Sequence, residues 1–368
     1  MRIAIVISQT PPIASGVARI AARIESGLRE RGCEVDVFSA SQLPRLFLSE
    51  FRFVNALPLL REILERGPYD VINVYGPVPT FSDVLLLLLA ANRRRLRGAR
   101  IVYSHIWDVE ISRKTAPLAW AYNLGTRLIA RLADYVVVAT QSHYDDLVRF
   151  VPAETVWIVP WGVDDCFICP AIPRKADEFT ILYVGQLRPY KGADVLLKAS
   201  AHIKDCRIII VGDGHCRDKY IQLAKTLDLR NVTFKGRVSD EELKDLYAIS
   251  RVIVLPSVSR LEAFGIVLLE GMGAGCVPVA SNLPGVTETV GDAGLTFEVG
   301  NAASLARALD LLKTDHPLLN RLSHKAWARA QTYSWDVTCQ NYLNIFSHIT
   351  SPVRNATNTI VTLPEVPE

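Results

Sequence analysis

Apolar positions along this chain follow two alternating patterns. One is a short continuous run of aliphatic and β-branched residues, which is typical of a parallel strand buried on both faces. The other repeats apolar residues at helical spacing, as at Val17, Ile20 and Ile24. Runs of the first kind lie at residues 2–8, 101–105, 134–139, 180–184, 208–211, 232–236, 251–255 and 276–280. Strands that alternate with helices predict an α/β fold with doubly wound parallel sheets.

Three apolar segments need separate interpretation. Residues 46–64 carry many apolar and aromatic side chains broken by arginines, which predicts a core helix, with a surface-seeking helix as the alternative. The apolar run at residues 84–91 is far shorter than the roughly 20 residues that span a bilayer, so we expect no transmembrane segment. The run at residues 2–8 leads into a Gln-Thr-Pro-Pro turn without a small-residue cleavage site, so we expect a first strand and not a signal peptide.

Composition and charge narrow the class of protein. The chain has 368 residues, of which 49% are hydrophobic and 21% charged, which is ordinary for a globular protein of about two or three domains. The net charge of +3 is uneven, because residues 1–150 hold 19 Lys+Arg against 14 Asp+Glu. This excess favours an acidic partner surface for the first half. No aromatic and basic residues interleave as a stacking platform requires, which argues against a nucleic-acid partner.

The seven cysteines are scattered through the chain. This pattern favours a reducing, cytoplasmic compartment over a disulfide framework. Cys166 and Cys169 form a C-x-x-C, but no second pair of ligands accompanies them at the spacing of a zinc site. We expect them to be linker residues.

A cluster of arginines follows the apolar run at 84–91. One interpretation is a solvated helix end, favoured by the helix dipole. The other is a patch for anionic lipid headgroups, where each basic residue contributes about 1 kcal/mol. The second would make the protein peripheral on the inner face of a membrane, and the sequence leaves both open. The cluster consists of Arg93, Arg94, Arg95, Arg97 and Arg100.

Two glutamates eight positions apart, Glu262 and Glu270, flank Phe264 and Gly265. The strand before them ends at Pro256, so Glu262 falls in a loop at the carboxyl end of a parallel sheet, where such sheets bind ligands. A helix that starts near Phe264 and Gly265 directs free backbone N–H groups at the same loop, which suits a phosphate. Carboxylates beside a phosphate suit a sugar nucleotide, whose hydroxyls they can bind. The alternative is that both glutamates are ordinary polar positions.

The stretch PSVSRLEAFGIVLLEGMGAGCVPVASNLPG around these glutamates resembles the E-x7-E motif of family 4 glycosyltransferases. Four more segments resemble the same family in order, and the resemblance covers residues 2 to about 346. It implies the GT-B architecture, in which two doubly wound Rossmann-like domains face each other across a cleft. The further segments are VWIVPWGVD at 156–164, TILYVGQLRPYKG at 180–192, IIIVGDG at 208–214 and YSW at 333–335.

The resemblance also implies the domain limits. Residues 1–165 would form an acceptor-side domain, completed by a C-terminal helix at about 335–350. Residues 178–334 would bind the nucleotide sugar, after a linker that is rich in proline and charge. We expect the tail at 351–368 to be disordered, because it has three prolines and no apolar periodicity.

Residues in the second domain acquire roles through the resemblance. Lys191 matches a lysine that binds the donor diphosphate, whereas Gln186 stands where the family has an arginine. Arg188, two residues on, would point the same way in an extended loop, so we expect it to supply the missing guanidinium. Glu270 would bind the ribose hydroxyls, and Glu262 would lie near the donor sugar. Val238 would edge the base, while Phe264 and Gly265 begin the helix at the phosphates.

Residues in the first domain would complete the site. His105 ends a strand and resembles a histidine that faces the donor sugar. Gly16 resembles a glycine that meets the donor phosphate or the acceptor, although Ser15 replaces the second glycine of the usual pair. Asp108 and Glu110 form a D-x-E that is too weak to predict a metal, and the resemblance implies metal-independent chemistry. We expect neither a metal nor another cofactor.

The resemblance implies a retaining hexosyltransferase. It would move a hexose from a nucleotide-sugar donor such as GDP-mannose or UDP-glucose to a hydroxyl of a glycan or lipid-linked acceptor, in polysaccharide or glycolipid biosynthesis. A sugar-nucleotide epimerase of related fold and a non-catalytic scaffold remain as alternatives. Gln186 favours the scaffold, whereas Glu262, Glu270 and Lys191 oppose it.

Overall fold

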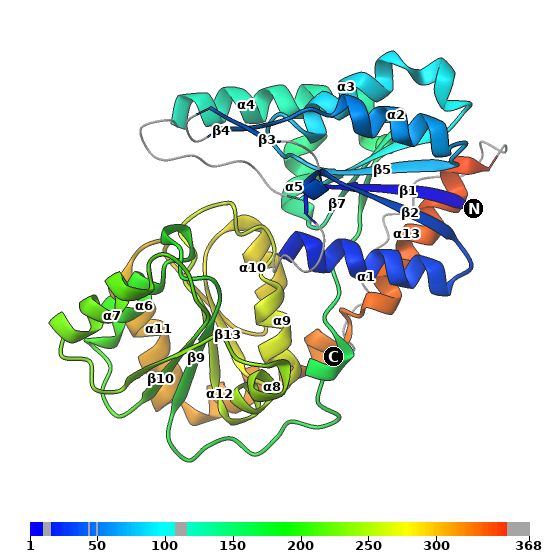
Figure 1. Cartoon of the computed structure of the whole chain (residues 1–368). Coiled ribbons are helices and arrows are strands. Elements are labelled where there is room, and N and C mark those ends of the chain that lie inside the picture. Colours follow the sequence, from blue (N-terminus) through cyan, green and yellow to red (C-terminus); the bar gives the residue numbers. More distant parts are fainter. Residues whose placement is uncertain (10–15, 43–44, 49–50, 107–115, 352–368) are drawn as a thin grey trace. The chain divides into compact units, whose positions relative to one another are not determined.

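The computed structural model describes residues 1–9, 16–42, 45–48, 51–106 and 116–351. Internal contacts divide the chain into two compact units (Figure 1). Unit 1 comprises Met1–Trp161 and the C-terminal helix α13 (Trp335–Thr350), and unit 2 comprises Gly162–Ser334. Both units are α/β structures, as the apolar pattern predicts.

Unit 1 is built on a six-stranded parallel sheet in the order β2-β1-β5-β6-β7-β8. Every side chain of β5 is buried, which explains why the strands read as continuous apolar runs and not as alternating ones. β5 and β6 pair so that Gly76 lies opposite His105 at their carboxyl ends. The strands are β1 (Arg2–Ile7), β2 (Glu34–Ser39), β5 (Val71–Gly76), β6 (Arg100–His105), β7 (Tyr135–Val138) and β8 (Val156–Ile158).

The helices of unit 1 cover this sheet, and α13 returns to it from the far end of the chain. α13 packs against α1, where a Cβ added at Gly27 would fall 2.8 Å from Cβ of Cys339. The small residue therefore sets how closely the two helices approach. The helices are α1 (Gly16–Glu30), α2 (Leu57–Arg66), α3 (Ser82–Ala91), α4 (Ala116–Ile129) and α5 (Gln141–Leu147).

The prediction of one helix over residues 46–64 is wrong in its first half. β3 (Arg45–Leu48) and β4 (Phe51–Val54) pair as an antiparallel hairpin, and α2 begins only at Leu57. Both hairpin strands are rich in phenylalanine, leucine and valine, residue types that suit strands at least as well as helices. In such a short segment, apolar content does not separate the two.

Unit 2 repeats the design with a second six-stranded parallel sheet in the order β11-β10-β9-β12-β13-β14. The sequence predicts five of these strands to within one or two residues at each end. The strands are β9 (Thr180–Val184), β10 (Arg207–Val211), β11 (Val232–Gly236), β12 (Val252–Leu255), β13 (Val277–Ser281) and β14 (Leu295–Phe297).

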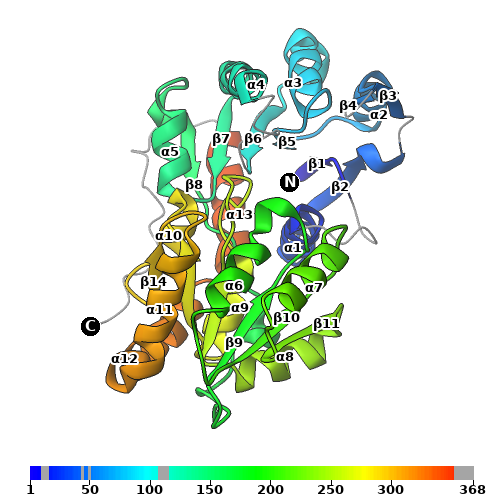
Figure 2. The same cartoon turned by 90° about the vertical axis from the view of Figure 1, so that its left-hand side faces the viewer.

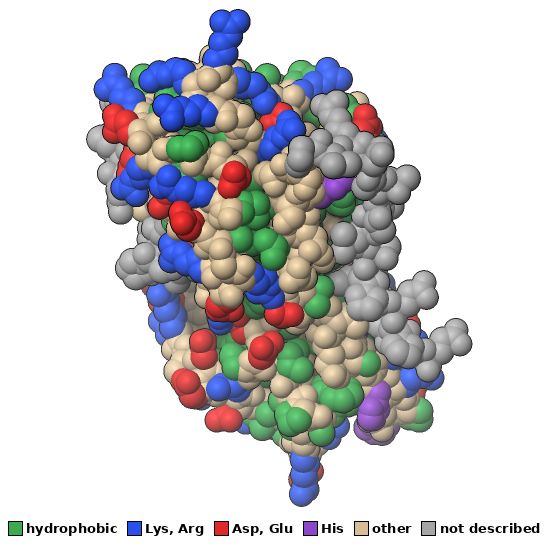
Figure 3. All heavy atoms as spheres, turned by 90° about the vertical axis from the view of Figure 1, so that its right-hand side faces the viewer, with side chains coloured by type: hydrophobic (Ala, Val, Ile, Leu, Met, Phe, Trp, Pro, Cys, Tyr) green, Lys and Arg blue, Asp and Glu red, His purple; other side chains and the backbone are tan. Residues whose placement is uncertain are grey.

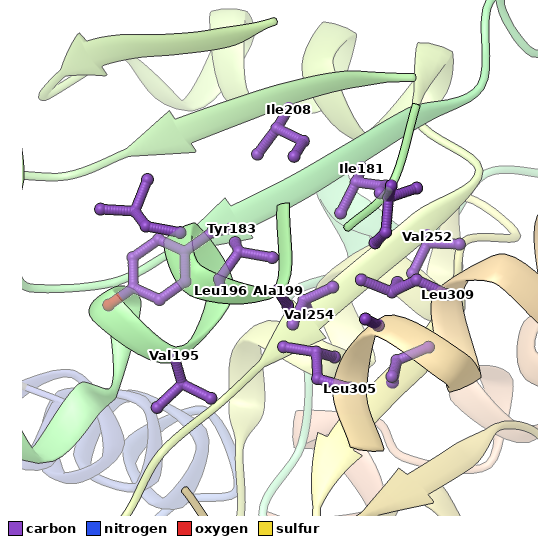
Figure 4. Close-up of a cluster of buried hydrophobic side chains, with 14 of the residues drawn as sticks. Ile181, Tyr183, Val195, Leu196, Ala199, Ile208, Val252, Val254, Leu305 and Leu309 are labelled. Carbon is purple, nitrogen blue, oxygen red and sulfur yellow. The ribbon is translucent and has the colours of Figure 1, made fainter. Parts of the chain in front are cut away.

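One buried cluster of unit 2 joins this sheet to the helices on one of its faces. Ile181 and Val252 of neighbouring strands lie with Leu196 of α6 and Leu305 of α11 in one buried cluster (Figure 4). All four side chains are fully buried. The helices are α6 (Ala193–Ser200), α7 (Arg217–Thr226), α8 (Asp240–Ile249), α9 (Ile266–Gly273), α10 (Pro284–Val290), α11 (Ala302–Thr314) and α12 (His316–Gln331).

Local helix signals in unit 2 behave as the sequence indicates. The Ser239 side chain caps α8 by accepting a 3.2 Å hydrogen bond from the backbone N–H of Glu242. α9 occupies the predicted apolar segment after Gly265. Within the described ranges, no helix is long and apolar enough to cross a membrane.

Candidate functional site

The predicted site residues of unit 2 lie in loops at one edge of its sheet. β9, β10, β12 and β13 run parallel, so their carboxyl ends meet at the same edge. The loop after β9 carries Gln186, Arg188 and Lys191, and the loop after β12 carries Glu262. This edge is where open α/β sheets bind ligands.

The loops after β9 and β12 are held tightly against each other. Gly192 has a φ of +66°, and a Cβ there would overlap the carbonyl oxygen of Pro256. The backbone N–H of Val258 donates a 2.8 Å hydrogen bond to the carbonyl of Tyr190. Only glycine permits both this backbone conformation and this approach. The contact brings Lys191 beside the loop that carries Glu262.

Lys191 and Glu262 form an ion pair. Lys191 Nζ lies 2.5 Å from Glu262 Oε2, and Ser257 Oγ donates to the same oxygen at 3.0 Å. Burial by itself lowers the pKa of Lys191, but the charge of Glu262 and the neighbouring Tyr190 raise it more, so the net pKa is raised. Lys191 is therefore a cation at neutral pH, and its side chain keeps 17% exposure.

Arg188 supplies a second cation next to this pair. It is exposed, and its charge lies near enough to Lys191 to disfavour the protonated lysine. Within the described residues, no acceptor is recorded for its guanidinium, while its carbonyl accepts from Tyr220 at 3.3 Å. Gln186 lies two residues earlier, and its backbone carbonyl accepts a 2.9 Å hydrogen bond from the N–H of Arg188. The site thus presents two cations and one carboxylate.

The glycine turn after β10 packs against the loop after β9. Gly212 has a φ of +124°, and a Cβ there would overlap the carbonyl oxygen of Gly185. Leu187 N–H donates to the carbonyl of Asp213 at 3.0 Å. Packing between two turns therefore accounts for this glycine, without a phosphate.

Glu270 lies inside α9 and is 2% exposed. Its Oε2 accepts a 2.8 Å hydrogen bond from the hydroxyl of Tyr247 on α8. A buried carboxylate needs such a partner, because its desolvation is costly. Tyr247 is a residue that the sequence reasoning missed, since nothing in a mid-helix tyrosine signals a partner 23 positions later.

The remaining predicted residues of unit 2 line the start of α9 and a neighbouring loop. Gly265 caps α9 in the left-handed conformation, with a φ of +84°. Phe264 is buried and packs edge-on against Tyr333, with ring centroids 6.0 Å apart. Val238 is half-buried in the loop between β11 and α8.

His105 and Gly16 belong to unit 1. His105 is 3% exposed at the end of β6 and meets the edge of His143, with ring centroids 6.1 Å apart. His143 Nδ1 lies 2.7 Å from Oγ1 of Thr140, which caps α5. The sequence reasoning missed His143, although Thr140 three residues earlier is a helix-start signal directly after the strand that neighbours β6. Asp108 and Glu110 lie outside the described residues.

Gly16 begins α1 and is exposed. Its φ is not in the left-handed region, and a Cβ there would have no atom within 4 Å. Neither the backbone nor packing within the described residues therefore requires glycine at this position.

Comparisons with known proteins agree on one type of protein. The model "Glycosyltransferase Family 4" matches residues 14–166, and "Glycosyl transferases group 1" matches residues 168–329. A D-inositol 3-phosphate glycosyltransferase of Nocardia farcinica is 26% identical over 94% of this chain and 89% of its own length. The corresponding protein of Streptomyces bingchenggensis is 30% identical, but that match spans 67% of this chain and 60% of the relative.

Solved structures show the same fold. Anabaena HepE in complex with UDP and glucose superposes with a TM-score of 0.73 at 21% identity, over 94% of this chain and 99% of its own. At this identity the likeness concerns the fold alone.

Proposed function

Because the chain belongs to the family 4 glycosyltransferases of GT-B fold, we propose that it moves a hexose from a nucleotide-sugar donor to an acceptor hydroxyl with retention. The chain is a glycosyltransferase; the donor, the stereochemistry and the acceptor are the proposed parts. The single observation that carries the proposal is the cluster of Arg188, Lys191 and Glu262 at the carboxyl ends of β9 and β12. A structural role explains the Lys191–Glu262 pair, but it gives no reason for the second cation beside it, the exposed Arg188.

Two cations at one point suit a diphosphate. Arg188 can offer its guanidinium to phosphate oxygens, and Lys191 adds a point charge. When the bond from the sugar to the β-phosphate breaks, negative charge grows on the phosphate, and fixed cations stabilise that charge most. We therefore assign both residues to the leaving nucleotide, and in this proposal they take the place of a metal or another cofactor.

In this proposal, Lys191 interacts both with Glu262 and with the donor diphosphate. Its carboxylate is held by Lys191 and Ser257, so it lies beside the diphosphate position and close to the bond that breaks. There it can stabilise positive charge on the sugar ring. The leaving phosphate would take the acceptor proton on the same face, as the family mechanism implies, and this gives retention.

The other predicted residues have narrower roles. Glu270 would accept hydrogen bonds from the ribose hydroxyls, the first turn of α9 after Phe264 and Gly265 would face the phosphates, and Val238 would edge the base. In unit 1, His105 would serve the donor sugar, and Gly16 would leave room for a ligand to approach the start of α1.

We place the donor among hexose nucleotides such as GDP-mannose and UDP-glucose. HepE shares the fold and is solved in complex with UDP and glucose, so a donor of this class is compatible with the fold. The acceptor in this proposal is a glycan or lipid-linked hydroxyl, and a lipid-linked acceptor would bring the protein to a membrane as a peripheral enzyme.

A thermal-shift series with UDP, GDP and ADP tests the donor site. One of them should stabilise the protein, by about 2.7 kcal/mol at a hundredfold excess over Kd. Its hexose derivative should then lose its sugar only when an acceptor is added. No stabilisation by any nucleotide would oppose the proposal, and an isomerised or free sugar from donor alone would point to an epimerase.

A further inference from the structure

Two neighbouring helices of unit 1 expose large apolar side chains to solvent. On α3, Val84 is 38% exposed and Leu87 is 49% exposed. On α4, Trp120 is 69% exposed and Leu128 is 47% exposed. Each pair lies on one side of its helix, because residues three or four apart, or twice four apart, share a face.

The two helices form one layer. α3 precedes β6, α4 precedes β7, and these strands are parallel neighbours in the sheet. Right-handed crossovers therefore place both helices on the same face of the sheet, and α3 contacts α4 and the turn that follows it. Figures 1 and 2 show them side by side. Their exposed sides make a single outer surface, which we call the α3–α4 face.

The arginine cluster follows α3 directly in the chain, and its members differ in whether they are bonded to other parts of unit 1. Arg93 is tied to Asp134 at 2.8 Å and to the carbonyl of Leu132, and Arg100 bonds the carbonyl of Ile349. Arg94, Arg95 and Arg97 are exposed. Arg95 donates a weak 3.5 Å hydrogen bond to the neutral side chain of Asn92, so all three keep their charge for a partner.

The exposed arginines sit at the end of α3 and the turn η2 (Arg93–Leu96). Arg95 and Arg97 line a shallow hollow whose other walls include Ile63, Leu64 and Tyr69. Figure 3 shows many Lys and Arg side chains over the upper part of one face, with fewer Asp and Glu and some hydrophobic side chains among them. Exposed apolar groups, an exposed tryptophan and adjacent arginines are the combination that suits a membrane interface.

We propose that the α3–α4 face docks on an anionic lipid bilayer. Val84, Leu87, Trp120 and Leu128 enter the interfacial region, and Arg94, Arg95 and Arg97 bind lipid phosphates. Four acidic side chains besides Asp83 lie on or beside these helices within the described residues. Asp134 is paired with Arg93, Asp146 is paired with Arg127 of α4, and Glu62 of the neighbouring helix α2 is paired with Arg66, which leaves Glu65 of α2 and Asp83 of α3. The charge of the face is therefore complementary to anionic headgroups and not to a zwitterionic surface. The inference rests on the proposed function only for the lipid-linked acceptor that would make docking useful.

Vesicle sedimentation with the full chain tests the docking. Vesicles of phosphatidylglycerol and phosphatidylcholine should bind the wild type at least tenfold more strongly than phosphatidylcholine alone, and salt should weaken the binding. Replacing Arg94, Arg95 and Arg97 with Gln should remove this preference. Leu87→Ser with Trp120→Ala should lower binding to anionic vesicles at least fivefold.

Matched controls come from unit 2. Lys219, Arg307 and Arg321 are exposed basic residues, and Leu311 is 45% exposed, so their replacement by Gln and Ser should leave binding unchanged. Equal binding to both vesicle types, or equal losses in controls and docking variants, would overturn the proposal. So would a dimer in sedimentation velocity that the Leu87 and Trp120 changes dissociate, if vesicle binding is absent.

Nucleotide thermal shifts on the same variants separate the two proposals. The docking variants should keep the wild-type response to nucleoside diphosphate. A protein that binds vesicles but no nucleotide would support the docking and oppose the proposed function. A protein that binds a nucleotide but no anionic vesicles would support the proposed function and oppose the docking.

Discussion

The two units share a six-stranded parallel sheet but differ at the carboxyl ends of their strands. In unit 2, left-handed glycines such as Gly192 and Gly212 follow the strands and let neighbouring turns press together. In the described part of unit 1, the left-handed glycines Gly32 and Gly98 instead precede strands. The strand ends of unit 2 are consequently locked to one another, and they hold the charged side chains.

The difference indicates that unit 2 holds its charged side chains in a fixed geometry, whereas the surface of unit 1 can vary with the acceptor. A diphosphate is the same in every donor, so a rigid pair of loops that fixes Arg188 and Lys191 suits it. Acceptors differ between enzymes, and unit 1 carries His105 at the end of β6 and His143 in α5, together with the exposed α3–α4 face. We therefore expect substitutions at the unit 2 loops to affect the donor, and substitutions on the α3–α4 face to affect surface binding alone.

The largest effect should come from Glu262→Gln. Turnover should fall roughly 100-fold or more, because the carboxylate acts as charge develops in the transition state. Binding of free nucleoside diphosphate should not weaken, since Lys191 loses its competing partner. Single-turnover transfer and a nucleotide titration measure the two quantities. Glu242→Gln, which breaks the exposed pair with Lys235 at 2.9 Å, is the control that should leave both unchanged.

Glu270→Gln should instead weaken nucleotide binding. One hydrogen-bonded charged group contributes about 1.5 to 3 kcal/mol, so Kd for donor and for nucleoside diphosphate should rise together by about 10- to 150-fold. Such uniform binding appears in KM more than in kcat. Equal losses of nucleotide affinity in Glu262→Gln and Glu270→Gln would show that the two glutamates do not have separate roles in transfer and in nucleotide binding.

Arg188→Ala should weaken donor binding by about tenfold, at the lower end of the range for charged hydrogen bonds because the side chain is exposed. Calorimetric titration of the nucleoside diphosphate measures this, with the exposed Arg230→Ala as the control. If Arg188→Ala binds as the wild type does while Lys191→Ala does not bind, Arg188 has not replaced the arginine that Gln186 displaces.

Tyr247→Phe should have the smallest effect. Loss of the hydroxyl that orients Glu270 should weaken nucleotide binding by about 3- to 10-fold, as expected for one hydrogen bond of about 1 kcal/mol. It should also reduce the preference for ribonucleotides over 2′- and 3′-deoxyribonucleotides, which a merely structural role would not do. Tyr69→Phe, whose hydroxyl donates to Asp36 at 2.7 Å in unit 1, is the matched control. An unchanged ribose preference would contradict the role of Tyr247.

The fold follows from the sequence wherever burial on both faces imposes a continuous apolar run, as at β9 and β12. The prediction from sequence fails at residues 46–64, where apolar content alone does not distinguish the hairpin from a helix. The pairing of Lys191 with Glu262 across 71 positions was not predicted, because it depends on the close approach of Gly192 to Pro256. Tyr247 was missed for the same reason, since tertiary packing brings it to Glu270, whereas His143 had a local signal in the helix cap at Thr140.

Hydrogen exchange with the nucleotide that gives the largest thermal shift tests the donor site most directly. Peptides that cover residues 185–192 and 256–270 should gain protection on binding, because their backbone N–H groups lie in the loops assigned to the diphosphate and at the start of α9. Peptides from α3 and α4 should be unchanged. Binding without protection in those two segments, or with protection confined to unit 1, would contradict the assignment of the donor to unit 2.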